Sequence, residues 1–189
     1  MKSRSLTLAT FLSLVLTVPI SAATYHVDSA HSSVSFMVKH MNASFAMGRF
    51  NAIGGTFVVD EVDPSASKFD ITIKTESIDT ANAQRDAHLK NADFFNAKQF
   101  PVIAFKSKTV KTGAEKGSFE VAGDLTLHGV TKPITVKITH TGTAKSPQGT
   151  IAGILSTFTI KRSDYGMKGM LGPIGDDVTI TFSAEGGAK

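Results

Sequence analysis

The chain has no cysteine and no tryptophan, and it has only two tyrosines. The lack of cysteine excludes disulfide bonds, thiolate metal ligands, thiol nucleophiles and covalently attached haem. The stability of the fold must therefore come from buried apolar side chains and backbone hydrogen bonds. Thirteen phenylalanines provide most of the aromatic content, and their rings carry no polar group.

The charges are not strongly of one sign. The full chain has 20 basic and 16 acidic residues and a net charge of +4. If Lys2 and Arg4 are lost with a cleaved leader, the net charge falls to +2. This value is too small to indicate a nucleic-acid partner. Lysines also alternate with acidic residues along the expected strands, which is typical of a solvated surface.

A long apolar run occurs only at the start of the chain. Lys2 and Arg4 precede the apolar stretch 6–20, and Ser21, Ala22 and Ala23 offer small residues for cleavage. A basic start, a short apolar run and a small-residue exit are typical of a secretory signal peptide. We expect residues 1–23 to be removed and residues 24–189 to fold in a bacterial periplasm. The run is too short for a span and no second run follows, so we expect no integral membrane span in the mature protein.

Apolar and polar residues alternate with period two through most of the remaining sequence. The pattern occurs in "VSFMVKH", "FDITIKT", "IAFKSKT", "SFEVAGDLTL", "ITVKITHT" and "VTITFSAE". Such alternation predicts antiparallel strands with one buried and one solvated face. Turn signals such as Asp63-Pro64 and Gly172-Pro173 separate the runs. We expect about eight strands, in a sheet that either splits into a sandwich or closes into a barrel.

The segment "DTANAQRDAHLKNADFF", residues 79–95, does not alternate. Its composition favours a helix that Asp79 or Thr80 would cap. Pro101 would start the next strand, because proline cannot continue a helix. There is no internal repeat and no low-complexity linker, so we expect a single domain over residues 24–189.

Two longer motifs make the chain similar to a known family. "SIDTANAQRDAHLKNADFFNAKQFPVIAFKS" and "GDLTLHGVTKPITV" resemble the YceI-like family of polyisoprenoid-binding proteins, as do "YHVDSAHSSVSFMVKHM" and "GRFNAIGGTFVVDE" near the start. The resemblance implies an all-β fold, a single extended, lipocalin-like antiparallel barrel with one short helical insertion. It also implies a long hydrophobic tunnel that accepts a polyisoprenoid or another long-chain amphiphilic lipid. A homodimer is left open.

The apolar residues on the inner faces of the expected strands and helix are the candidates for the tunnel wall. Phenylalanine suits such a wall, because its ring has no polar group that would need a partner. The alternative for each of these residues is packing in a filled core, since a barrel of this size is filled by side chains or holds one small ligand. The candidates are Phe36, Val38, Phe57, Ile71, Ile73, Leu89, Phe94, Phe105, Phe119, Val121, Leu125, Leu127, Ile134, Val136, Ile138, Ile180 and Phe182.

Four basic or titratable side chains are candidates for contact with the polar head of a ligand: His40, Arg49, Arg85 and His88. An arginine could form a forked contact with a phosphate or a similar group. The alternative for Arg85 is an ion pair with Asp86 or Asp93 that fixes the helix to the barrel. We expect this structural role ahead of the ligand role, because structural ion pairs are common.

Catalytic and metal sites are poorly supported by the sequence. "DSAHSS" places Asp28, His31, Ser32 and Ser33 together, but successive side chains on a strand point apart. There is no G-x-S-x-G elbow. The histidines show no H-x-H or H-E-x-x-H spacing. We therefore expect no catalytic residues, no metal and no cofactor. The histidines are His26, His31, His40, His88, His128 and His140.

These observations favour a non-enzymatic periplasmic carrier of a polyisoprenoid or a similar lipid. The alternative is a non-enzymatic envelope stress-response or interaction protein whose barrel is simply filled. An enzyme is the third hypothesis, and it would require turnover that depends on His31.

Overall fold

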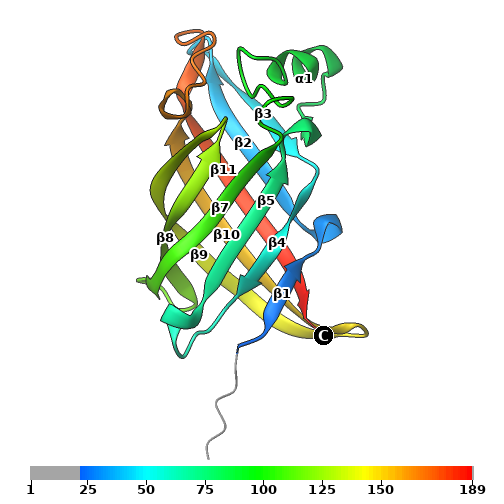
Figure 1. Ribbon diagram of the computed structural model, residues 1–189, viewed down its shortest axis with the longest axis vertical. Helices are drawn as coiled ribbons and strands as arrows, with labels where there is room; N and C mark the ends of the chain where they lie inside the picture. The colour runs from blue at the N-terminus through cyan, green and yellow to red at the C-terminus, as the bar shows by residue number, and fades with distance from the viewer. Residues whose placement is uncertain (1–21, 189) are drawn as a thin grey trace, which may run out of the picture.

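The alternating segments form antiparallel strands in the computed structural model, which describes residues 22–188. Eleven strands pair in the order β1-β4-β5-β7-β8-β9-β10-β11-β2-β3-β6, and a further pairing of β1 with β11 closes the sheet into a barrel (Figure 1). The strands are β1 (Thr24–Val27), β2 (Ser33–His40), β3 (Ser44–Phe50), β4 (Ile53–Val58), β5 (Lys68–Lys74), β6 (Ile78–Asp79), β7 (Val102–Thr112), β8 (Ser118–Leu127), β9 (Val130–Ser146), β10 (Gly149–Lys161) and β11 (Ile174–Ala188).

These strands occupy eight positions around the barrel, as the sequence predicts. Three of the positions are held by two strands in succession, with a break between them. The 3₁₀ turn η1 (Ser29–His31) separates β1 from β2, residues 51–52 separate β3 from β4, and the 3₁₀ turn η3 (Thr75–Ser77) separates β5 from β6. Each pair continues along one neighbour, because β1 and β2 both pair with β11. The all-β barrel with one helical insertion is confirmed.

The barrel has two distinct ends. The terminus end is where β1 begins and β11 finishes, and the helix end carries helix α1 (Ala83–Leu89) (Figure 1). Aromatic rings fill the terminus end: Tyr25 stacks on Phe57 at 5.3 Å between ring centroids, and Phe69 packs against Phe119 at 6.4 Å. These rings are almost fully buried, so this half of the barrel is a packed core.

The helical insertion is shorter than the sequence predicts. Asp79 lies in β6 rather than at a helix start, and Ala81 adopts a positive φ of 58° that turns the chain before the helix. Asn82 is therefore the cap, and its side-chain oxygen accepts a hydrogen bond from the Arg85 amide at 2.9 Å. No helix within residues 22–188 is long and apolar enough to cross a membrane.

The predicted signal peptide lies almost entirely outside the described residues. Its export function therefore stays a prediction. Only its last two residues, Ala22 and Ala23, are described, and they lead directly into β1.

Candidate functional site

An apolar cavity of about 460 Å³ occupies the helix end of the barrel. Its size falls within the range of pockets that hold small molecules. The wall is formed by inward-facing side chains of β2, β3, β8, β10 and β11 and by residues of α1. The packed aromatic rings of the terminus end lie beneath it. The resemblance implies a tunnel along the barrel, whereas the structure has a cavity confined to one half.

Eight of the predicted tunnel residues line this cavity. They come from the four strands β2, β5, β8 and β11, from α1 and from the loop that follows it, so distant parts of the chain meet around one space. They are Phe36, Val38, Ile73, Leu89, Phe94, Leu125, Leu127 and Ile180.

The other predicted tunnel residues point inward or pack against the core but do not line the cavity. Alternation identifies the inner face of a strand, but it carries no information about depth along the barrel. Phe105 is an example. Its ring packs directly on Gly123, so closely that a Cβ at this glycine would lie 2.8 Å from the ring. The residues in this group are Phe57, Ile71, Phe105, Phe119, Val121, Ile134, Val136, Ile138 and Phe182.

Several wall residues were missed by the sequence argument. Ile103, Phe158, Ile160 and Val178 are in phase with the inner faces of their strands, so alternation could have identified them. Met167 and Met170 belong to the loop 166–173, which has no period to follow. The filled-barrel alternative describes the terminus end well, but the helix end is hollow.

Three of the predicted head-group residues, His40, Arg85 and His88, are exposed side chains at the edge of the cavity. They come from the end of β2 and from α1, so the fold brings them to the same rim. Basic or titratable groups at the edge of an apolar cavity could bind the polar end of an amphiphile while the tail is buried.

Arg85 fixes α1 to the barrel, but its partner is not the predicted carboxylate. Its Nε donates to Thr80 Oγ1 at 2.8 Å and its Nη2 donates to the Thr80 carbonyl at 2.7 Å. Asp86 accepts from the Thr80 amide at 2.8 Å and from the Thr80 hydroxyl at 2.5 Å. Asp93 lies 3.9 Å from His88 instead. Thr80 is therefore the residue through which the helix is attached.

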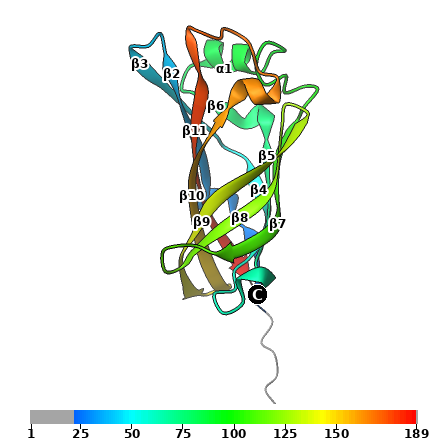
Figure 2. The ribbon, with the colours of Figure 1, turned by 90° about the vertical axis from the view of Figure 1, so that its left-hand side faces the viewer.

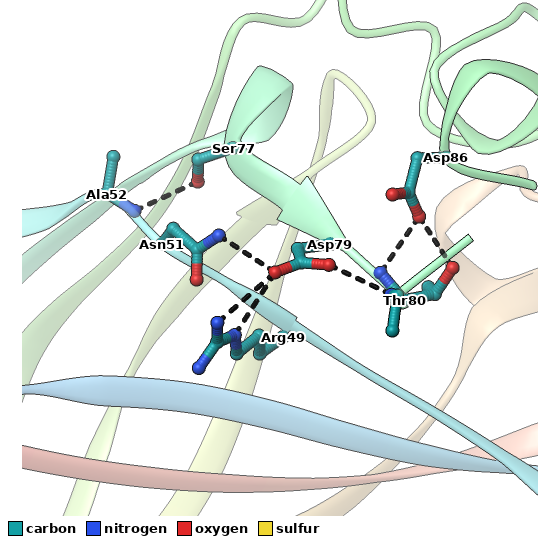
Figure 3. A network of polar contacts seen from close by, with 8 residues as sticks. Arg49, Asn51, Ala52, Ser77, Asp79, Thr80 and Asp86 are labelled. Carbon is teal, nitrogen blue, oxygen red and sulfur yellow. Dashed lines mark hydrogen bonds and ion pairs between the residues drawn. The ribbon is translucent and has the colours of Figure 1, made fainter. Parts of the chain in front are cut away.

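Arg49 lies outside the cavity, in contrast to the prediction for it. Its guanidinium donates to Asp79 at 3.3 Å, and the Asn51 amide donates to the same carboxylate at 3.2 Å (Figure 3). The Ala81 backbone amide, Asn51 and Arg49 together lower the pKa of Asp79 below its usual value. Arg49 thus joins β3 to β6 at the point where β6 ends.

Arg162 is a functional candidate that the sequence argument missed. It lines the cavity, yet only 4% of its surface is exposed. Its guanidinium donates to the carbonyls of Met167 at 2.9 Å, Gly169 at 2.7 Å, Ile174 at 2.9 Å and Gly175 at 2.9 Å. Burial lowers its pKa, but an arginine remains charged in proteins.

A signal for Arg162 was present in the sequence. On β10 the buried residues Ile154, Ser156 and Ile160 alternate with exposed ones, and Arg162 continues that inner phase. A positively charged side chain on the buried face of a strand is rare unless hydrogen-bond or ion-pair partners are available. Those partners are two backbone carbonyls of the loop 166–173 and two at the start of β11, which the sequence does not place.

His128, within the motif "GDLTLHGV", holds the turn between β8 and β9. Its Nδ1 lies 3.0 Å from the Tyr165 carbonyl, and its ring meets the edge of Phe100 at 4.8 Å. Its Nε2 is buried and has no hydrogen-bond partner among the residues that the structure describes. The histidine therefore links this turn to the 3₁₀ turn η4 (Arg162–Tyr165) beside the cavity.

The residues considered for catalysis do not form a triad. His31 Nδ1 lies 2.8 Å from Asp28 Oδ2, and this contact raises the pKa of His31 and lowers that of Asp28. The Ser32 hydroxyl donates to the backbone carbonyl of Glu185 at 3.3 Å rather than to His31. Ligand atoms of Asp28, His31 and Glu185 lie within 4.8 Å of one another, but all three side chains remain partly or fully exposed.

A closed antiparallel barrel with an apolar cavity in one end is the architecture of a small-molecule-binding barrel. The chain belongs to the YceI-like family, since the family model described as "YceI-like domain" matches residues 25–186. Protein YceI of Escherichia coli O157:H7 is 38% identical over 187 residues, which cover 97% of either chain. The resemblance seen in the sequence is thereby confirmed.

Two solved structures share the fold. BcnA of Burkholderia cenocepacia superposes with a TM-score of 0.74 at 24% identity, over 84% of this chain and 98% of BcnA. A domain from Saccharophagus degradans, described as a polyisoprenoid binding domain implicated in plant cell wall breakdown, superposes with a TM-score of 0.68 at 16% identity. That match covers 89% of this chain and 99% of the domain. At these identities the likeness concerns the fold alone.

Proposed function

We propose that this protein binds and carries a polyisoprenoid or a similar long-chain amphiphile in the periplasm, without catalysing a reaction. The observation that carries the proposal is the apolar cavity, whose open edge holds Arg85, His88 and His40. The hydrocarbon tail would lie in the cavity and the polar end at this edge. A domain of the same fold from Saccharophagus degradans is described as polyisoprenoid-binding, which supports the choice of ligand class.

The energetics of burial support a lipid without many polar contacts. A tail of about ten buried methylene groups would contribute ~8 kcal/mol before the costs of association are subtracted. Association and ordering cost roughly 4–15 kcal/mol, so the polar rim and the rigidity of the barrel decide the final affinity. Each further methylene group that fits adds about 0.8 kcal/mol, so selectivity for tail length must come from the size of the cavity.

The packed terminus end sets a limit on that size. Tyr25, Phe57, Phe69 and Phe119 close the barrel below the cavity. A tail longer than the cavity must fold back within it or extend through the opening. Affinity should therefore rise with tail length until the cavity is full and then stay level.

A series of isoprenoid alcohols of increasing length tests the proposal by fluorescence displacement or calorimetry. Wild-type protein should show a rise in affinity followed by a plateau. Ala46→Phe adds a ring to the cavity wall opposite Val38 and should weaken binding of the longer alcohols at least tenfold.

Ala104→Phe is the matched control, because Ala104 pairs with Thr72 and Thr126 and does not line the cavity. It adds the same ring without filling the cavity and should leave binding unchanged. A wild-type protein that binds none of the alcohols, in a folded state, would contradict the proposal. The homodimer and the envelope stress role stay predictions.

A further inference from the structure

Large apolar side chains are exposed around the opening of the cavity. Met41 is 61% exposed, Phe45 57%, Met47 64%, Met170 52% and Leu171 42%. Single exposed apolar residues are ordinary on a protein surface, but a group of them around one feature marks an interaction site. We call these five residues the rim patch.

The rim patch is one surface, although its members are far apart in the sequence. Met41, Phe45 and Met47 belong to the hairpin of β2 and β3, and Met170 and Leu171 belong to the loop 166–173. The Met41 amide donates to the Pro173 carbonyl at 2.6 Å, which joins the two segments. Both segments lie at the helix end, where the hairpin extends away from the barrel wall (Figure 2).

The rim patch is continuous with the cavity. Phe45, Met47 and Met170 also line the cavity. β6 pairs with β3 only at Arg49 and Phe50, so within residues 22–188 the part of β3 before Arg49 has only β2 beside it. The exposed wall residues of α1 face the same opening. A ligand that enters the cavity must therefore pass the rim patch.

Two lysines are free at this rim, and Asp93, which lies 3.9 Å from His88, is the exposed carboxylate beside them. Lys39 lies opposite Phe45 in the hairpin, and the Lys168 carbonyl accepts a hydrogen bond from the Leu171 amide. Neither lysine has an ion-pair partner within residues 22–188. The carboxylates of this end are mostly engaged: Asp79 by Arg49, Asp164 by Lys132, and Asp177 by Lys161.

We propose that the rim patch docks on an anionic phospholipid bilayer, so that the cavity opens toward the acyl chains. The apolar side chains would enter the interface and the lysines would contact lipid phosphates, which is the pattern of a peripheral membrane-binding surface. The docking goes beyond the proposed carrier function. It rests on that function only for the identity of the ligand that passes through the opening. A very poorly soluble ligand would then move between bilayer and cavity without crossing water.

A second copy of the chain fits this surface less well. Strand pairing along the free part of β3 would cover Phe45 and Met47 but would not by itself cover Met170 and Leu171, which lie on another loop. A symmetric pair of rims would also bring like charges together at Lys39 and Lys168, which is unfavourable. Anionic lipid complements both the apolar side chains and the lysines.

Flotation with lipid vesicles tests the proposal, with protein expressed from the full-length chain and purified in the form that the cell produces. Wild-type protein should float with vesicles of phosphatidylcholine and phosphatidylglycerol, and added salt should weaken the association. The double variant Met41→Ser, Leu171→Ser removes two patch residues that do not line the cavity. Its vesicle affinity should fall roughly tenfold or more.

Two further variants separate the contributions. Lys39→Gln with Lys168→Gln should reduce binding to anionic vesicles about fivefold per lysine and leave the weak binding to pure phosphatidylcholine unchanged. Val62→Ser is the matched control, because Val62 is 96% exposed but lies in the loop between β4 and β5, which contributes nothing to the rim. It should float like the wild type.

Binding of farnesol, a short isoprenoid alcohol, distinguishes failure of the docking from failure of the carrier function. If Met41→Ser, Leu171→Ser binds farnesol normally but loses the vesicles, the docking is supported. A wild-type protein that binds farnesol but never floats would overturn the docking alone. Light scattering that shows a dimer, which the double variant dissociates, together with no flotation, would assign the rim patch to a second copy instead.

Discussion

Arg85 donates two hydrogen bonds to Thr80, one to the hydroxyl at 2.8 Å and one to the backbone carbonyl at 2.7 Å. The Asp86 carboxylate accepts hydrogen bonds from the amide and the hydroxyl of the same threonine (Figure 3). Thr80 is buried and also lines the cavity, so one residue joins helix α1, the cavity and the end of β6. The position of the rim depends on this contact.

Thr80→Val should loosen the rim while keeping its shape. Valine preserves the volume but removes the hydroxyl that binds both Arg85 and Asp86. The free energy of unfolding should fall by about 1–3 kcal/mol, because the hydrogen bonds of the hydroxyl to two charged side chains are lost. Urea unfolding measures this change, and the dissociation rate of a bound isoprenoid probe should rise. Thr80→Ser, which keeps the hydroxyl, should behave like the wild type, and an equal loss in both variants would contradict this assignment.

Substitution of Arg162 should destabilise the fold more than substitution of any of the exposed basic residues. Arg162→Met leaves four backbone carbonyls without their donor, and unfolding free energy should fall by about 3 kcal/mol or more. Arg162→Lys keeps the charge but loses the planar fork, so it should recover only part of the loss. Limited proteolysis should then cut the loop 166–173 sooner. An Arg162→Met variant as stable and as protease-resistant as the wild type would show that the guanidinium does not organise this loop.

Substitution of Phe182 should deepen the cavity. The inner face of β11 carries Val178 and Ile180 in the cavity wall, and Phe182 is the next inward residue toward the terminus end. Phe182→Ala should lower the free energy of unfolding by about 3–5 kcal/mol. It should also deepen the cavity, so that the plateau in affinity shifts to longer isoprenoid alcohols.

Phe57→Ala is the control for that shift. It removes the same ring, but Phe57 stacks on Tyr25 deeper in the packed end. Its destabilisation should be similar and its chain-length plateau unchanged. Equal plateaus in all three proteins would mean that the ligand does not reach the floor of the cavity.

Acid should weaken the contact between Ser163 and Asp176. The Ser163 amide at 2.9 Å and hydroxyl at 2.8 Å donate to the Asp176 carboxylate and hold its pKa below the ordinary value of 3.8. A carboxyl whose pKa is lowered by folding stabilises the fold above the unfolded pKa, and this contribution disappears as the pH falls through the folded pKa. Ser163→Ala should therefore be less stable than the wild type at neutral pH. Denaturant unfolding should show that the difference shrinks on acidification below about pH 4, where a constant difference would argue against the carboxylate.

Alternation predicted the antiparallel strands well because it acts on every strand in the same way, whereas closure into a barrel rather than a sandwich came from the family resemblance. Val34, Phe36 and Val38 face inward as their period requires, and the same rule holds on β8 and β11. The breaks within three barrel positions were not predicted, because the pattern continues on both sides of η1 and η3. The helix was placed correctly but made too long, since the positive φ of Ala81 has no signature in composition.

The candidate site was predicted only in part, for a related physical reason. Alternation separates inside from outside, but the division of the inside into a packed half and a hollow half depends on how rings such as Phe57 and Phe119 meet across the barrel. Arg85, His88 and His40 line the cavity, and their contact with a ligand head group stays a prediction. Arg49 was misplaced because its partner Asp79 lies in a two-residue strand that no pattern reveals.

Mass spectrometry of the protein purified from its own cells, first under native conditions and then after organic extraction, shows whether the cavity holds a lipid. We expect one long-chain amphiphile per chain in the wild type and in Ala104→Phe, and a smaller amount in Ala46→Phe. An isoprenoid mass would also identify the cargo. A protein that carries no lipid, and that takes up none when isoprenoids are added, would contradict the claim that the cavity is a lipid site.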